Sequence, residues 1–292
     1  MIYELRHLTT YGYSRSVPFA RCILRLLPRS GVGQDVQKSE LLITPRPAER
    51  SDGICFFGNR MTTITITKPH RELKVEMRAR IEVNRPAPPH PALTRGWEEV
   101  ARLALGSTSL APDSPTHHLY PSRLVPHVQG VVEYARTSFT PGRPVLEAAS
   151  ELMARIRRDF TYDPEATEVT TPLAEAFAAR HGVCQDFAHI MIAGLRGLGL
   201  PGAYVSGYIR TIPPPGEKRL EGADASHAWV MLWCGPDTGW VGLDPTNDLI
   251  VADDHIVTAF GRDYADVAPL DGVVIGPGTQ KVGVAVDVIP VG

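Results

Sequence analysis

The sequence predicts an α+β protein, with an N-terminal antiparallel β-sandwich-like domain followed by a part built of helices plus antiparallel sheet. Three observations lead to this prediction. Apolar and polar residues alternate through much of residues 1–85, apolar residues recur at helical spacing from residue 144, and strand-like segments follow the helices. Alternation with a period of two is typical of half-buried strands, and spacings of three and four are typical of helices. Helices followed by an antiparallel sheet are an α+β order.

The composition is that of a globular protein and excludes several classes. The chain has 292 residues, 43% hydrophobic and 21% charged, which is long enough for two domains. Its 30 basic and 32 acidic residues give a net charge of −2, so neither nucleic acid nor a membrane is an expected partner. No apolar run approaches the roughly 20 residues of a membrane span. The charged, alternating N-terminus is unlike a signal peptide.

The four cysteines, Cys22, Cys55, Cys184 and Cys234, lie far apart in the sequence. Their spacing fits neither a disulfide framework nor a paired metal-binding motif. A reducing cytoplasm is therefore the predicted compartment. We expect Cys22, Cys55 and Cys234 to be core or strand residues, which leaves Cys184 as a candidate nucleophile.

Residues 1–85 are predicted to form the first domain. Four segments in it alternate or are short and apolar, and we expect them to be strands: Tyr3–Tyr13, Cys22–Leu27, Met61–Thr67 and Leu73–Val83. Gly58 and Asn59 suit a tight turn between two strands.

Prolines define the expected domain boundary. Pro86, Pro88, Pro89 and Pro91 interrupt the strand pattern, so we expect residues 86–143 to be a proline-rich linker and connecting segment. Residues 144–292 then form the second domain, with a C-terminal strand at its end.

Within the second domain we expect three helices and then three strands. The first helix begins near Pro144, the second follows Thr171 as its cap, and the third begins near Cys184 and ends at Gly197 and Gly199. The expected strands are residues 203–209, 227–234 and 239–243. The polar loop at residues 213–224 is a candidate rim for a site.

Cys184 follows Gly182 and Val183 at the expected start of a helix. A thiol there faces unpaired N–H groups and the positive end of the helix dipole, and both favour the thiolate. The same N–H groups can bind an oxyanion. The alternative is a buried cysteine packed as a small hydrophobic residue.

His227 opens one predicted strand and Asp244 closes the next, with a turn near Gly235 between them. In an antiparallel hairpin the two residues therefore lie directly opposite each other or within a few residues of that position. A carboxylate beside an imidazole fixes its tautomer and stabilises its protonated form. Individually, a histidine is more often a surface or core residue, and an aspartate before proline is more often a turn former.

A metal site is the weaker interpretation. The potential ligands are Cys184, Asp186, His189, His227, Cys234 and Asp244. Cys184 and His189 point in different directions on a helix, and no spacing fits zinc. We expect His117, His118 and the segment Asp253-Asp254-His255 to be solvated loop residues without a site role.

The arrangement resembles the bacterial transglutaminase-like cysteine protease family of the transglutaminase-like superfamily. The resemblance rests on three long motifs, residues 181–189 around Cys184, residues 222–229 around His227 and residues 239–247 around Asp244, and on the tract at residues 261–270. It covers nearly the whole chain, because the N-terminal strands also resemble the family's β-rich N-terminal region.

The resemblance implies a papain-like core with Cys184 as nucleophile, His227 as general base and then acid, and Asp244 as the orienting residue. This chain has Gln185 where animal transglutaminases have tryptophan after the cysteine, and the nearest upstream tryptophan is Trp97. The backbone N–H of Cys184 is therefore the expected oxyanion donor. Gln185, Tyr162, Asp186 and Trp229 are further candidates for oxyanion or substrate binding.

Three functions remain open at this point. The first is hydrolysis of a peptide or small amide through a thioester acyl-enzyme. The second is transfer of the same acyl group to an amine, and the third is a non-catalytic binding or assembly module. The mechanism requires no cofactor, and no clustered acidic loop indicates calcium.

Overall fold

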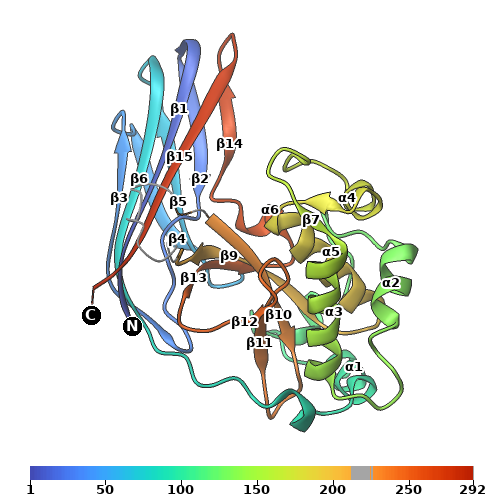
Figure 1. Cartoon of the computed structure of the whole chain (residues 1–292). Helices are drawn as coiled ribbons and strands as arrows, with labels where there is room; N and C mark the ends of the chain where they lie inside the picture. Colours follow the sequence, from blue (N-terminus) through green and yellow to red (C-terminus); the bar gives the residue numbers. More distant parts are fainter. Residues whose placement is uncertain (212–223, 225, 292) are drawn as a thin grey trace, which may run out of the picture.

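The computed structural model describes residues 1–211, 224 and 226–291, and it confirms the predicted α+β class. In Figure 1 a β-sandwich lies on one side of the molecule, and helices packed on a further antiparallel sheet lie on the other. Among the described residues, no helix combines the length and the apolar character needed to cross a membrane.

The sandwich consists of two four-stranded antiparallel sheets. The first contains, in spatial order, β15 (Gln280–Pro290), β1 (Ile2–Val17), β6 (His70–Val83) and β3 (Gln34–Thr44). The second contains β14 (Leu270–Ile275), β2 (Phe19–Leu24), β5 (Arg60–Ile66) and β4 (Glu49–Ile54). Every second residue of β6 from Leu73 to Val83 is buried, which is the alternation that the sequence shows.

The four strands expected in the N-terminal domain are present as β1, β2, β5 and β6, and Gly58 lies in the turn between β4 and β5 at a φ of 76°. The sequence analysis missed β3 and β4. Both are edge strands, and every residue of β4 is exposed, so neither carries the alternating apolar pattern by which the others were found.

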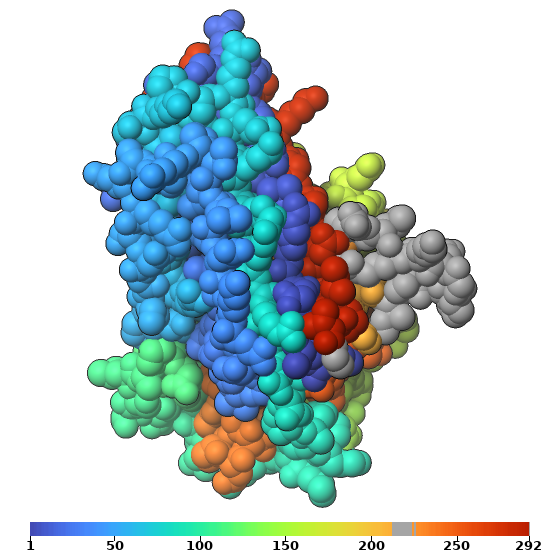
Figure 2. Space-filling model, turned by 90° about the vertical axis from the view of Figure 1, so that its left-hand side faces the viewer, coloured from blue at the N-terminus to red at the C-terminus, as the bar shows by residue number. Residues whose placement is uncertain are grey.

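The C-terminal strands differ in place from the sequence-based expectation. We predicted a C-terminal strand within the second domain, whereas β15 pairs with β1, and β14 pairs with β2. The C-terminal segment runs directly beside the N-terminal strand on the face shown in Figure 2. Alternation identifies a strand but not its partner, and this partner lies at the other end of the chain.

The second part is built on a five-stranded antiparallel sheet with helices against it. The strands are, in spatial order, β12 (Leu249–Ile250), β11 (Trp240–Asp244), β10 (Ser226–Trp233), β9 (Gly202–Ile209) and β13 (His255–Gly261). The helices are α1 (Trp97–Leu105), α2 (Gln129–Arg136), α3 (Val145–Asp159), α4 (Leu173–Ala179), α5 (Cys184–Gly197) and α6 (Tyr264–Val267). Short elements complete it: the 3-10 helices η1 (Pro91–Leu93) and η2 (Pro115–His118) and the parallel pair β7 (Thr161–Tyr162) and β8 (His181–Gly182).

Residues 86–143 are more than the linker that their prolines indicate. They contain α1 and α2, and Val100, Val131 and Val132 from these helices are buried in the same apolar core as α3 and α5. The prolines stop strand formation at residues 86–91, but they do not prevent the following segment from packing as helices.

The helix starts and ends follow the expected signals, with one exception. α3 begins after Pro144, α5 begins at Cys184, and Gly199 follows the end of α5 at a φ of 78°. The exception is Thr171, whose hydroxyl accepts a hydrogen bond from the N–H of Glu168 and does not cap α4.

Two amide side chains connect the sandwich to the second sheet. Gln34 donates to the carbonyl of Val257 at 2.8 Å and accepts from its N–H at 2.7 Å. Asn59 makes the same pair of bonds with Phe260, at 2.7 and 2.9 Å. These side-chain amides pair with backbone N–H and C=O groups of β13, which is the outer strand of its sheet and has no neighbouring strand on that side. The sandwich therefore fixes the position of β13.

We predict that Gly207→Ala destabilises the protein. Gly207 in β9 pairs with His227 on one side and Val257 on the other, and a Cβ there would lie 2.1 Å from the carbonyl oxygen of Ile256 and 2.5 Å from the Trp229 ring. Because a backbone atom cannot yield, the free energy of unfolding should fall by about 1–3 kcal/mol in urea titrations. Gly53→Ala in β4, where a Cβ meets nothing within 4 Å, is the control. Equal stabilities would contradict the close approach.

Candidate active site

Cys184 is the first residue of α5, as the sequence predicts, and it is partly exposed. Asp186 in the first turn is buried and caps the helix, because its carboxylate accepts from the N–H of Val183 at 2.9 Å and from the hydroxyl of Thr167 at 2.6 Å. Gly182 is required beside it, since a Cβ would lie 2.6 Å from this carboxylate. The local sequence thus fixes the helix start at the thiol, and the carboxylate of Asp186 caps that helix.

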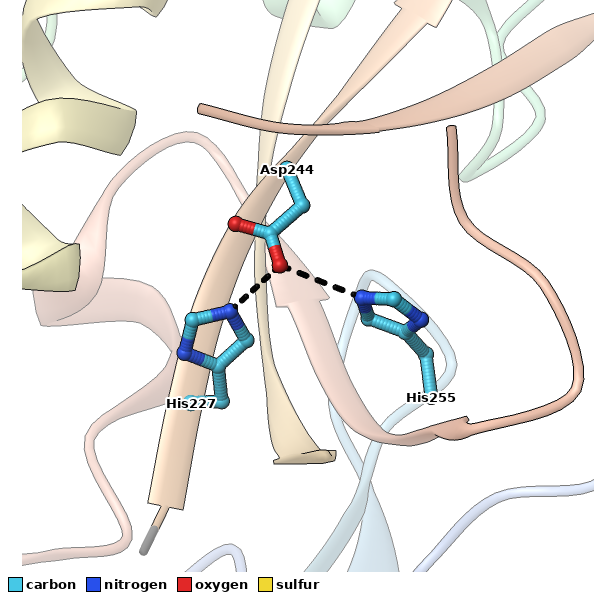
Figure 3. A group of neighbouring side chains, drawn as sticks. All are labelled: His227, Asp244 and His255. Atoms are coloured by element: carbon cyan, nitrogen blue, oxygen red, sulfur yellow. Dashed lines mark hydrogen bonds and ion pairs between the residues drawn. The ribbon is translucent and has the colours of Figure 1, made fainter. Parts of the chain in front are cut away.

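The hairpin of β10 and β11 brings His227 to Asp244. Val230 pairs with Leu243, so continuing the register by one residue places Asp244 opposite Trp229 and diagonal to His227 on the same face. The Nε2 atom of His227 lies 2.8 Å from Oδ2 of Asp244. In Figure 3 the other ring nitrogen of His227 points away from the carboxylate.

Burial and hydrogen bonding act in opposite directions on this pair. Complete burial of Asp244 favours its neutral form, but hydrogen bonds from His227, His255 and Asn247 outweigh it and hold the pKa of the carboxyl well below its usual range. Burial likewise opposes the charge of His227, but interactions with Asp244 and Cys184 raise its pKa to about 10. The pair is therefore an imidazolium beside a carboxylate at neutral pH.

The thiol of Cys184 also lies near His227. It is close enough to His227 to contribute, after burial and Asp244, to the raised pKa of the imidazole. It also contributes, after burial, to the raised pKa values of Tyr162, Tyr204 and Tyr264. The imidazole and these three phenol groups therefore lie in the neighbourhood of the thiol.

The other candidate residues occupy different positions around this group. The amide of Gln185 donates to the carbonyl of Val169 at 3.1 Å. Trp229 is fully buried, with its ring centre 6.1 Å from that of His227 and 5.2 Å from that of His255. Tyr162 is 49% exposed and is the one of these side chains that solvent reaches beside the thiol. An oxyanion or substrate-binding role for any of them stays a prediction.

His255 corrects the sequence-based expectation that Asp253-Asp254-His255 is a solvated segment. Its side chain is buried, and its Nε2 atom lies 3.2 Å from Oδ2 of Asp244 (Figure 3). Asp253 accepts from the N–H of Arg85, and Asp254 accepts from the hydroxyl of Tyr3. The two acidic residues before His255 led to the prediction of an exposed segment. His255 is instead the buried first residue of β13.

His118 also differs from its expected solvated state. It is completely buried among aromatic rings, with ring-centre distances of 5.4 Å to Phe57, 5.3 Å to Trp240 and 5.0 Å to Phe260. Burial is the main reason that its pKa falls to about 3. His118 is therefore a neutral core residue of the contact between the two parts. The candidate rim at residues 213–224 lies outside the described residues except for Asp224, whose carboxylate accepts from the N–H of Val288.

Three potential metal ligands meet in the described part of the chain. The nearest ligand atoms of His227, Asp244 and His255 all lie within 4.8 Å of one another. The set differs from the one considered from the sequence: Cys234 is buried, and His189 accepts a hydrogen bond from the N–H of Tyr264. In this group each ligand atom already takes part in a hydrogen bond, so a metal ion would have to displace the proton that joins His227 to Asp244.

Comparisons with known proteins show the family to which this α+β chain belongs. Residues 3–82 match the bacterial transglutaminase-like N-terminal region, and residues 133–245 match the transglutaminase-like superfamily. An uncharacterized protein of Mycobacterium tuberculosis (strain H37Rv) is 42% identical over 99% of this chain and 92% of its own length. One from Mycobacterium leprae is 33% identical over 97% of this chain and 96% of its own. The chain belongs to the transglutaminase-like superfamily, and it carries the bacterial N-terminal region.

A solved structure supports the same fold. The crystal structure of a "putative cysteine protease" from Cytophaga hutchinsonii superposes with a TM-score of 0.76 over 99% of this chain and 90% of that one, at 19% identity. The similarity therefore extends over both the sandwich and the second part. It confirms the expected architecture, including the N-terminal β-rich region.

We predict that Asp244→Asn lowers the pKa of His227 by several units. Burial alone favours the neutral ring, so its pKa should fall from about 10 toward or below the ordinary 6.5. Nitrogen NMR of the histidine side chains against pH measures this. Because the folded-state pKa is raised, the stabilisation by His227 is fully present below pH 6.5 and is lost as pH rises through about 10. Titration of His227 near 6.5 in both proteins would contradict the assignment.

We predict that His255→Phe reduces stability at neutral pH and weakens its dependence on acid. Asp244 loses one donor, which should cost about 1–3 kcal/mol. Its depressed pKa gives stability that is present above its unfolded value of 3.8 and is lost as pH falls. In the variant the pKa of Asp244 should be depressed less. The free energy of unfolding should therefore fall less between pH 6 and pH 3 than in the wild type. Urea unfolding at several pH values measures this, with His90→Phe at an exposed position as the control.

Proposed function

We propose that this protein is a cysteine-dependent hydrolase of peptides or small amides, with Cys184 as nucleophile, His227 as proton carrier and Asp244 as the residue that orients His227. One observation carries the proposal: a single buried imidazole is hydrogen-bonded to a buried carboxylate and lies close enough to a helix-terminal thiol for that thiol to contribute to its raised pKa. Its raised pKa keeps it protonated at neutral pH, which favours a thiolate beside it.

The chemistry follows from these positions. The Cys184 thiolate adds to the amide carbonyl, and the resulting oxyanion lies at the start of α5, where the first backbone N–H groups have no acceptor within the helix. His227 donates its proton to the leaving amine as the C–N bond breaks, which leaves a thioester and a neutral imidazole. The imidazole then accepts a proton from water as the hydroxide adds to the thioester, and the carboxylic acid leaves as Cys184 is regenerated.

Acyl transfer to an amine is the second candidate, and membership of the transglutaminase-like superfamily favours it. It shares every step up to the thioester, where an amine replaces water. Tyr162, half-exposed beside the thiol, supports hydrolysis, because solvent reaches this side of the thioester. A non-catalytic module would need neither the thiol nor the raised pKa of His227.

The compartment and partners belong to the same proposal. All four cysteines are free thiols, which supports a reducing environment such as the cytoplasm. The substrate is a peptide or a small amide, and the net charge of −2 favours neither nucleic acid nor membrane as a partner.

We predict that iodoacetamide alkylates Cys184 selectively at pH 6. Cys22 and Cys234 are buried, and burial is the first cause that raises the pKa of each thiol, to about 11 and about 12. Cys55 is the other partly exposed thiol and serves as the internal reference. A thiolate paired with an imidazolium should react at least about tenfold faster than an ordinary thiol at this pH. Peptide mapping by mass spectrometry measures both rates.

Two variants and one assay complete the test. His227→Ala should slow labelling of Cys184, and Cys55→Ala should leave it unchanged. Amide substrates offered with a tagged primary amine then separate the outcomes, since hydrolysis releases the free acid and transfer incorporates the tag. Equal labelling of Cys184 and Cys55 in folded wild-type protein, unaffected by His227→Ala, would refute an activated nucleophile.

A further inference from the structure

A cavity of about 460 Å³ lies where the sandwich meets the second part of the protein. This volume is within the range of small-molecule binding sites. None of the residues Cys184, His227 and Asp244 lines it. Its lining comes from both parts: Arg25, Cys55, Phe56 and Phe57 from the sandwich, and His117, Arg262, Ala265 and Asp266 from the second part.

The guanidinium group of Arg25 has no partner among the described residues. Its Nε and Nη1 atoms are buried and make no hydrogen bond. Its third nitrogen, Nη2, is the one that is not sealed from solvent, and it has no acceptor there either. An arginine side chain is always charged, and a partly buried charge without a counter-ion is unfavourable. The cavity therefore contains a positive charge that nothing in the described part of the chain compensates.

Asp266 lines the same cavity but is already paired with Arg262. Its Oδ2 atom accepts from the Nε of Arg262 at 2.8 Å and from the backbone N–H at 2.9 Å, and its Oδ1 atom accepts from Nη2 at 3.0 Å. These two side chains balance each other, so the surplus charge of the cavity is that of Arg25. The Arg262 side chain is half-exposed, and its Nη1 atom makes no hydrogen bond to the described residues. The cavity thus offers two accessible N–H donor groups, Nη2 of Arg25 and Nη1 of Arg262.

The rim of the cavity on the sandwich side is apolar. Phe56 is 56% exposed at the turn between β4 and β5, and Ile54 just before it is also exposed. The Phe56 ring meets the ring of His117 edge-on, with 5.0 Å between ring centres, so the two parts of the protein hold it in place together. Large apolar side chains that are exposed side by side are typical of a binding surface.

The charge and the shape of this lining select the ligand. One surplus positive charge matches a monoanion, whereas a doubly charged phosphate would also face the carboxylate of Asp266. A carboxylate accepts hydrogen bonds from guanidinium groups in a favourable planar geometry. The exposed phenyl ring beside these donors favours a carboxylate that is attached to an aromatic or aliphatic group.

We propose that this cavity binds a monocarboxylate attached to an apolar group, with Arg25 holding the carboxylate and Phe56 packing against the apolar group. The site is independent of the proposed hydrolase. A small aryl- or alkyl-carboxylic acid has this chemistry, and so does the C-terminus of a polypeptide that ends in an apolar residue.

Binding is tested on the full chain by calorimetric titration with 3-phenylpropanoate and with 3-phenylpropan-1-ol, its uncharged counterpart. Neither probe contains an amide, so turnover does not interfere. The acid should bind at least about tenfold more tightly than the alcohol, because it forms a hydrogen bond between charged groups. Arg25→Gln should abolish this preference. Arg21→Gln, at an exposed position of β2 outside the cavity, should leave it unchanged.

Two further measurements separate binding from effects on the fold. Because the guanidinium of Arg25 has no partner, Arg25→Gln should leave thermal stability unchanged or raise it. Phe56→Ala should weaken binding of 3-phenylpropanoate by about three- to tenfold and leave binding of propanoate, which has no ring, unchanged.

Cys55 reports occupancy of the cavity directly, since its partly exposed thiol lines the wall. At about ten times the Kd of 3-phenylpropanoate, alkylation of Cys55 by iodoacetamide should slow about tenfold, while alkylation of Cys184 stays unchanged. Equal affinity for acid and alcohol, an acid preference that survives Arg25→Gln, or undiminished labelling of Cys55 would each overturn the proposal.

A last comparison distinguishes the two sources of the carboxylate. The full chain carrying Cys184→Ala is titrated with a glycine-rich peptide that ends in phenylalanine, as the free acid and as the C-terminal amide. Tighter binding of the free acid identifies a polypeptide C-terminus as a ligand of the site. Binding of 3-phenylpropanoate without binding of either peptide identifies a small carboxylic acid.

Discussion

The buried carboxylate of Asp244 is the constraint on which the rest of the site depends. A charge removed from water is unfavourable unless each of its lone pairs finds a donor. Here Oδ2 accepts from His227, His255 and Asn247, and Oδ1 accepts from the N–H groups of Thr246 and Asn247. Because the carboxylate is so well satisfied, it stays ionised, and its charge fixes the protonation and direction of His227 (Figure 3).

The N-terminal sandwich reaches this site through one strand. His255 stands at the start of β13, and the backbone of β13 is held from the sandwich side by the amides of Gln34 and Asn59. Gly207 in β9 lets the backbone of β13 and the ring of Trp229 approach closely. The sandwich therefore does more than cover the second sheet, since it positions a donor to the buried carboxylate.

The sequence predicts the parts of this arrangement that follow from local rules. A helix start predicts the place of Cys184, and a hairpin midpoint brings His227 to Asp244. His255 escaped prediction because it reaches Asp244 through the pairing of β13 with β9, from which three other strands separate it in the sequence, and because two aspartates precede it. The place of β15 escaped for the same reason, since its partner is the first strand of the chain.

The same geometry bears on how the proposed acyl-enzyme is resolved. The His227–Asp244 pair serves hydrolysis and transfer equally, because both need a neutral imidazole to accept a proton after the amine leaves. The difference must arise where the second nucleophile approaches. Tyr204 is buried, whereas Tyr162, which pairs with Gly182 two residues before the thiol, is half-exposed. Water needs no binding site and an amine does, so solvent access beside Cys184 is the feature that bears on the proposed choice between hydrolysis and transfer.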